Sequence, residues 1–369
     1  MKRLAFIIAM MTSCLCASAQ QFQYDAKFDY IFMNSEFDRS HNVFEKSGTL
    51  HAIRLTPTIG LDWNQGRSAR HSLRLGVDLF KNMGEGLPAG EIFHEAVIYY
   101  RADVQAGRGT FSAIAGVFPR SFSESIYSDA FFSDDVLYLD NNFEGMFLKY
   151  KAPHFYADLG LDWCGMKGLT RREAFRIMSS GNVDLFGTDF FKFGWAASMF
   201  HYAGSQTVRG VVDNTMVNPY LTADLSSAVG MQVLSLKACP IVGYQWDRVY
   251  DENTHMPWGL ETVLTAQKWN FGIENVYYRG DDLYYYYDKY GGDVYYGEPF
   301  YSWPWEGKSW MDKFSFYYQP KISDYLSLRV AIELFFGQKD ENCPVLYRGT
   351  NQIASLIVNL ESLLKKNNR

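Results

Sequence analysis

Apolar and polar residues alternate strictly along many segments of this chain. Between residues 22 and 32 every even position is apolar, whereas the odd positions from 23 to 29 are polar or charged. The same alternation recurs near residues 53–62, 73–79 and 326–336. Side chains that repeat every second residue lie on one face of a β-strand, so the pattern predicts strands with one apolar and one polar face.

Sixteen such segments are predicted, and the connections between them are mostly long and short in turn. The expected strands are 22–33, 48–63, 69–80, 92–104, 110–118, 143–151, 154–164, 171–180, 189–203, 217–227, 229–246, 257–268, 270–280, 311–321, 324–337 and 351–364. Bacterial outer-membrane barrels have short periplasmic turns and long outer loops. We therefore expect an all-β fold, a single transmembrane antiparallel β-barrel of about 16 strands (14 to 18), with both ends in the periplasm. The strand count is least secure at residues 165–188, where the outer connection looks shorter than the inner one.

The first residues have the pattern of an export signal. Lys2 and Arg3 precede an apolar run, and Ala17-Ser18-Ala19 supplies an Ala-x-Ala cleavage site. The run is too short for a transmembrane helix, and the residues before Cys14 and Cys16 fit a lipoprotein signal poorly. We expect a signal peptide at 1–19, a barrel domain at 20–369 and a location in the outer membrane. Lipid, lipopolysaccharide and the barrel-assembly machinery are the partners that this location implies.

Charge and cysteine content narrow the functional classes. The formal charge of −6 becomes −8 once Lys2 and Arg3 are removed with the signal, which argues against nucleic acid as a partner. Aromatic residues make up 17% of the chain, as expected for aromatic girdles at both membrane interfaces. The three later cysteines (Cys164, Cys239 and Cys343) are too widely spaced to indicate a metal or redox motif, although one disulfide could form. We expect neither a cofactor nor a bound metal.

A barrel of this size leaves room for an aqueous channel, which predicts passive, porin-like diffusion of small polar solutes. The long connection at 119–142 is acidic, and neighbouring strands carry arginines on their polar faces. If that connection folds into the lumen, the opposing charges would form a selective constriction; a solvated outer loop is the alternative. The candidate constriction residues are Arg54, Arg74, Arg101, Arg120, Glu124, Asp129, Asp134, Asp135 and Glu144.

This region also carries a family resemblance. Gly116-Val117-Phe118-Pro119-Arg120 is followed, after a loop rich in Ser, Asp and Tyr, by Asn142-Phe143-Glu144-Gly145. The motif resembles that of uncharacterised, porin-like outer-membrane barrel proteins of the Bacteroidota, and this resemblance implies a barrel with no established catalytic residues. The chain departs from outer-membrane barrels at its end, Leu363 to Arg369, which lacks the usual terminal aromatic residue.

Residues 277–310 form the densest aromatic tract and contain several aspartates. Aromatic faces beside carboxylates suit sugar rings, so an alternative function is a binding or adhesion barrel whose outer loops capture glycans or a partner protein. A loop that packs on itself over the barrel mouth is the simpler interpretation. The candidate binding residues are Asp281, Asp282, Tyr284, Tyr296, Trp303 and Trp305.

An outer-membrane hydrolase is the third hypothesis. The seven histidines are scattered, and neither Gly-x-Ser-x-Gly nor His-Glu-x-x-His occurs. The sequence therefore names no catalytic residue, and we expect a protein that is not an enzyme.

Overall fold

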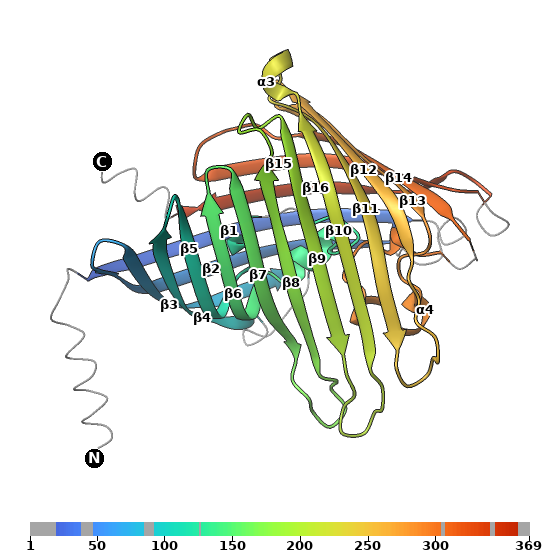
Figure 1. Cartoon of the computed structure of the whole chain (residues 1–369), viewed down its shortest axis with the longest axis horizontal. Helices are drawn as coiled ribbons and strands as arrows, with labels where there is room; N and C mark the ends of the chain where they lie inside the picture. The colour runs from blue at the N-terminus through green and yellow to red at the C-terminus, as the bar shows by residue number, and fades with distance from the viewer. Residues whose placement is uncertain are drawn as a thin grey trace.

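A computed structural model describes residues 20–37, 47–84, 92–124, 127–303, 307–339 and 344–360 of the chain. Sixteen antiparallel strands pair in sequence order, and β1 (Gln21–Phe37) pairs with β16 (Tyr347–Asn359) to close the sheet. Every strand therefore has two neighbours, so no sheet edge is left open. The predicted fold, a single closed barrel of 16 strands, is confirmed (Figure 1).

The strands match the predicted segments to within five residues, and the largest differences fall at the strands 212–224 and 347–359. The remaining strands are β2 (Gly48–Gln65), β3 (Ala69–Asn82), β4 (Phe93–Ala106), β5 (Gly109–Pro119), β6 (Asn142–Ala152), β7 (Phe155–Gly165), β8 (Ala174–Asp184), β9 (Phe191–Tyr202), β10 (Val212–Asp224), β11 (Val233–Asp247), β12 (Trp258–Lys268), β13 (Phe271–Gly280), β14 (Ser309–Tyr318) and β15 (Leu326–Gly337).

The two faces of the strands follow the predicted alternation. In β1 and β3 the apolar side chains of Phe22 and Leu75 point outward and are 62% and 52% exposed. Asp29 and Asp78 point inward and are 5% and 0% exposed. A water-soluble sheet would bury the apolar set, whereas a barrel in lipid presents it outward.

The connections define two ends of the barrel. The short-turn end carries 66–68, 107–108, 153–154, 185–190, 225–232, 269–270 and 319–325; the long-loop end carries 38–47, 83–92, 120–141, 166–173, 203–211, 248–257, 281–308 and 338–346. The strand count was least secure near residues 165–188. There the connection 166–173 at the long-loop end is longer than the connection 185–190 at the short-turn end, so the alternation of loop lengths continues and no strand is miscounted.

Proline has no backbone N–H for the strand ladder, which suggests a position beyond the lipid band. Pro240 lies instead near the middle of β11. It sits opposite Leu260 of β12, and the ladder between β10 and β11 is interrupted from Asn218 to Tyr220. The Asn218 side chain donates to the Pro240 carbonyl at 3.2 Å. A side-chain hydrogen bond thus satisfies a backbone acceptor where the strand ladder is broken.

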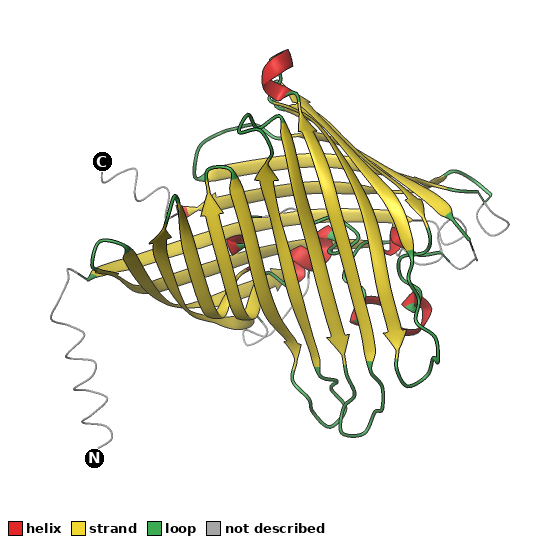
Figure 2. Cartoon of the chain, viewed as in Figure 1, coloured by secondary structure: helices red, strands yellow, loops and turns green. Residues whose placement is uncertain are grey.

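Two long connections fold into the barrel and carry its short helices. We call residues 120–141 the lumenal strap, with η2 (Arg120–Phe122) and α2 (Asp134–Leu139), and residues 281–308 the aromatic loop, with α4 (Tyr287–Tyr290), η3 (Gly291–Asp293) and η4 (Pro299–Tyr301). Figure 2 shows these helices between the walls, while α3 (Ser226–Val229) projects from the short-turn end. No helix among the described residues is long and apolar enough to cross a membrane.

Candidate functional site

The lumenal strap reaches the wall formed by β12 and β14. Ser128 donates to the carboxylate of Glu261 at 2.7 Å, and Asp129 pairs with Lys313. The strap also meets the aromatic loop, because the amide of Glu298 donates to the carbonyl of Asp129 at 2.8 Å. These contacts join residues more than 130 positions apart, so the strap crosses the lumen as a fixed element.

The predicted constriction arginines bond mainly to carboxylates of the wall. Arg74 contacts Asp62 at 2.7 Å and Arg101 contacts Asp103 at 2.8 Å, both near the short-turn end. Two of them also meet the strap: Arg54 donates to the carbonyl of Leu139 at 3.1 Å, and the Arg101 guanidinium lies 5.2 Å from the ring centre of Phe122. The structure therefore brings two of these three arginines against this connection, but pairs neither of them with its carboxylates.

Arg120 occupies the start of the strap and fixes it to the wall. Its guanidinium contacts Asp140, at the other end of the strap, at 2.5 Å, and Asp162 of β7 at 2.7 Å. It also lies 4.8 Å from the ring centre of Phe143. Arg120 thus joins the two ends of the strap to each other and to β7.

The predicted acidic residues face lysines that the sequence did not single out. Glu124 contacts Lys149 at 3.0 Å and also pairs with Lys151, while Lys313 is the partner of Asp129. Both carboxylates are therefore paired, which reduces the field that they project across the lumen. Alternation along the sequence could not reveal these partners, because it gives the face of a residue but not its neighbours.

The other acidic candidates take different positions. Asp134 and Asp135 form the first turn of α2, where Asp135 accepts a hydrogen bond from Ser133. Glu144 is exposed and shares the outward positions of Met146 and Leu148 on β6. Glu144 therefore does not project into the lumen as predicted, because its position in the two-residue period is that of the outer face.

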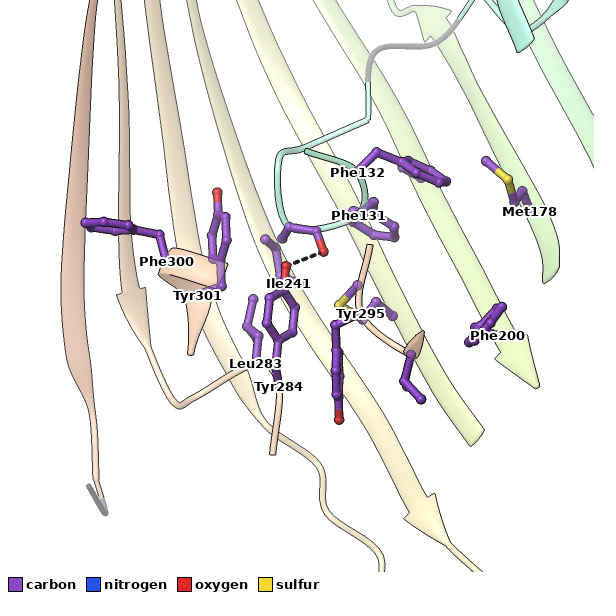
Figure 3. Close-up of a cluster of buried hydrophobic side chains, with 14 of the residues drawn as sticks. Phe131, Phe132, Met178, Phe200, Ile241, Leu283, Tyr284, Tyr295, Phe300 and Tyr301 are labelled. Carbon is purple, nitrogen blue, oxygen red and sulfur yellow. Dashed lines mark hydrogen bonds between the residues drawn. The ribbon is translucent and has the colours of Figure 1, made fainter. Parts of the chain in front are cut away.

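The aromatic loop and the strap bury their rings against each other inside the barrel. Tyr284 and Tyr301 are fully buried, and the Tyr284 hydroxyl donates to the carbonyl of Ala130 at 2.8 Å (Figure 3). Phe131 and Phe132 of the strap lie across from these rings. We call this set the lumen plug: Phe131, Phe132, Leu283, Tyr284, Tyr295, Phe300, Tyr301 and Trp303.

This packing decides where the predicted glycan-binding residues lie. Tyr284 is buried, Trp303 is 6% exposed, and the ring of Tyr296 covers the Arg176 guanidinium at 3.9 Å. Asp281 accepts from the amide of Trp258 at 3.2 Å, and Asp282 accepts from the amide of Tyr284 at 2.8 Å. These contacts favour the self-packed interpretation of the tract.

Trp305 lies outside the described residues, as does Cys343, whereas Cys164 and Cys239 are free thiols.

A second constellation lies on the outer face at the long-loop end. Phe175 of β8, His201 of β9, Asp213 of β10 and Trp246 of β11 are directly opposite one another across three strand pairs. Phe200 and Val212, the chain neighbours of His201 and Asp213, point into the lumen core. Successive residues of a strand point to opposite faces. The row therefore faces outward, within one or two residues of the strand ends.

The row contains a histidine oriented by a carboxylate. The Nδ1 atom of His201 lies 2.7 Å from Asp213, and Arg248 donates to the other oxygen of Asp213. The imidazole packs on the ring of Phe175, with centres 4.9 Å apart. Within the described chain, the Nε2 atom of His201 has no hydrogen-bond partner, so it is available to a ligand or water. Sequence reasoning missed this pair, which is visible only once the strand register is known.

Comparison with solved structures supports the class of protein that the fold defines. The chain resembles a loop-deletion mutant of OmpT, an outer membrane protein of Vibrio cholerae, with a TM-score of 0.54 at 8% identity over 92% of this chain and 99% of that one. It also resembles an anion-selective porin from Comamonas acidovorans, with a TM-score of 0.51 at 9% identity over 93% and 100% of the two chains. The fold is that of an outer-membrane β-barrel.

The family is shown by the sequence itself. The model of the lipid A 3'-O-deacylase-type family matches residues 18–366, so the chain belongs to that family. No curated protein matches the sequence. The family is named for an enzymatic activity, which contradicts the expectation that the protein is not an enzyme. That expectation was wrong because it relied on short linear motifs, whereas facing strands can bring distant residues together.

Proposed function

We propose that this protein hydrolyses an acyl ester of a membrane lipid at the outer face of the barrel, with His201 as the general base. The His201–Asp213 contact of 2.7 Å carries this proposal, and the family name supports a deacylation reaction. The position of the pair matters as much as its chemistry. An acyl ester held at the membrane surface would meet the outer rim of a barrel without leaving the lipid.

The proposed role of Asp213 is to orient the imidazole. Its carboxylate accepts from the Nδ1 atom of His201, which selects the tautomer with a free lone pair on Nε2. That nitrogen removes a proton from water as the hydroxide adds to the ester carbonyl carbon. The bond from that carbon to the alkoxy oxygen then breaks, and the imidazolium returns the proton to the departing alkoxide. A carboxylic acid and an alcohol result, so the proton count balances.

The neighbouring residues suit a lipid substrate. Phe175 packs on the imidazole, and Trp163 of β7 stacks on Phe175 with centres 5.7 Å apart. Aromatic residues concentrate at membrane interfaces, where one side of the ring is apolar and the other wet. Arg248, which is half exposed and pairs with Asp213, is the proposed cation that stabilises the charge developing on the carbonyl oxygen.

The test measures release of fatty acid from lipid A in vesicles that contain the purified protein, followed by mass spectrometry. His201→Asn keeps a hydrogen bond to Asp213 but removes the base, and it should reduce the rate at least ~100-fold. The control is His51→Asn, because His51 also points outward near the long-loop end, where Tyr30 is its partner at 3.0 Å. Full activity of His201→Asn, with an active wild type, would refute the proposed base.

Porin-like passage of small polar solutes remains the second candidate, and one feature favours it. A cavity of about 320 Å³ lies beneath the plug and is lined by polar side chains that include Asn182, Lys237 and Glu274. It supports entry of small hydrophilic solutes from the short-turn end. Liposome swelling in small sugars tests passage directly. Swelling without ester hydrolysis would favour the channel over the enzyme.

A further inference from the structure

A separate group of side chains at the long-loop ends of β3 and β4 has the composition of a metal site. We propose that Asp78, His94, Glu95 and Asn142 bind a divalent transition-metal ion such as Zn²⁺ or Mn²⁺. One ligand atom from each of Asp78, His94 and Glu95 lies within 4.8 Å of the other two. The site is independent of His201, and its test is binding and stability, not ester hydrolysis.

An irregularity in the sheet brings these residues together. Asp78 lies opposite Glu95, but the next pair joins Leu79 to Phe93, so the register shifts and His94 has no partner in the ladder. A β-bulge changes the direction of the side chains beside it, so the side chains of two consecutive residues can point to the same place. In a regular strand, His94 and Glu95 would point to opposite faces.

The charges at this point do not balance. Two carboxylates opposite one another on neighbouring strands repel. Arg54 is the nearest cation, with its Nε atom 3.4 Å from Asp78. Asp29 and Asp140 also lie near Arg54, but Lys27 and Arg120 pair with them at 3.1 Å and 2.5 Å. One guanidinium against the carboxylates of Asp78 and Glu95 leaves an excess of negative charge that a bound cation would offset.

Asn142 supplies an independent sign that a ligand belongs here. This residue is 2% exposed, and its Oδ1 atom is buried with no hydrogen-bond partner among the described residues. Its Nδ2 atom points at both carboxylates, 3.5 Å from Asp78 and in contact with Glu95. Oxygen and nitrogen of an amide exchange places by a flip. The flipped amide would aim its oxygen at the two carboxylates, an arrangement that a cation bound between them would stabilise.

The donor set indicates the kind of ion. It offers one imidazole nitrogen and three oxygens, whereas Ca²⁺ takes six to eight oxygen ligands. Imidazole with carboxylates suits Zn²⁺ and related ions, with water at any remaining position. The His94 side chain is exposed and provides a path for entry. Because Asn142 begins β6 directly after the lumenal strap, the ion would fasten the end of the strap to β3 and β4.

The experiment titrates Zn²⁺, Mn²⁺ and Ca²⁺ into the metal-free full-length protein in detergent and follows heat release and thermal unfolding. The wild type should bind one Zn²⁺ or Mn²⁺ and unfold at a higher temperature, with little response to Ca²⁺. Glu95→Gln should weaken binding at least ~10-fold. The control Glu274→Gln, on β13, should bind like the wild type. No binding of Zn²⁺ or Mn²⁺ at millimolar concentration, or equal binding by Glu95→Gln, overturns the proposal.

A second variant separates a metal site from a folding defect. Asn142→Asp adds a third carboxylate, which should lower the unfolding temperature in the absence of metal. If the ion binds between these groups, Zn²⁺ should restore the stability of Asn142→Asp and bind it more tightly than the wild type. Destabilisation that Zn²⁺ does not reverse would contradict the site.

Discussion

At the scale of single residues, Asp282 shows how the aromatic loop depends on its surroundings. Burial of this carboxyl raises its pKa to about 7, despite the hydrogen bond that it accepts from the amide of Tyr284. The folded protein therefore keeps a proton on Asp282 at pH values where the unfolded chain, with an ordinary pKa near 4, has lost it. Stability from this group is present at low pH and is lost as the pH rises towards 7.

This sign gives a testable pH dependence. Lowering the pH from 8 to 5 should raise the unfolding temperature of the wild type, because protonated Asp282 is the form that the loop buries. Asp282→Asn should flatten that part of the profile. Thermal unfolding in detergent across this range measures it, and Asp281→Asn serves as the control in the neighbouring position. A profile of Asp282→Asn identical to that of the wild type would assign the dependence to another group.

At the scale of elements, the barrel is joined across its lumen by the strap and the aromatic loop. Lys313 is 6% exposed and holds Asp129, while Glu261, which is fully buried, accepts from both Ser128 and Tyr301. Gly297 has no Cβ, and a Cβ there would collide with Tyr284 and Ala130. Close packing and buried polar contacts together make the two connections one structural unit.

Removing the cation of this unit should loosen it. Lys313→Met leaves the partly buried Asp129 without its partner, and the loss of one member of a buried ion pair costs about 3–5 kcal/mol. Urea unfolding in lipid vesicles measures the free energy. Lys192→Met is the matched control, because its partner Asp189 is 76% exposed and such surface pairs contribute at most about 1 kcal/mol. Equal costs for the two variants would mean that Lys313 does not anchor the strap.

At the scale of the whole molecule, the alternation of loop lengths predicts which end faces outward. In a background without native cysteines, Met166→Cys at the long-loop end should react with a membrane-impermeant maleimide on intact cells. Trp269→Cys, in the turn between β12 and β13, should react only after lysis. Both positions are well exposed, at 67% and 78%, so accessibility alone does not separate them. Labelling of Trp269→Cys alone on intact cells would reverse the orientation.

The sequence by itself determined the barrel, a count of about 16 strands, and the two faces of the strands that alternate most clearly. These properties depend on a local period of two, which lipid and lumen water impose on each strand separately. Glu144 shows the limit of this reasoning: it is among the predicted constriction residues, although its position in the period places it on the outer face.

Only the tertiary structure decided which residues meet. The lysine partners of Glu124 and Asp129, the plug that buries Tyr284, and the His201–Asp213 pair all depend on strand register and on the direction in which long connections fold. The expectation of a non-enzyme failed for the same reason, since it searched for catalytic groups along the chain. A strand pair brings residues 12 positions apart within 2.7 Å, and no linear motif records that contact, because hydrogen bonding between strands creates it.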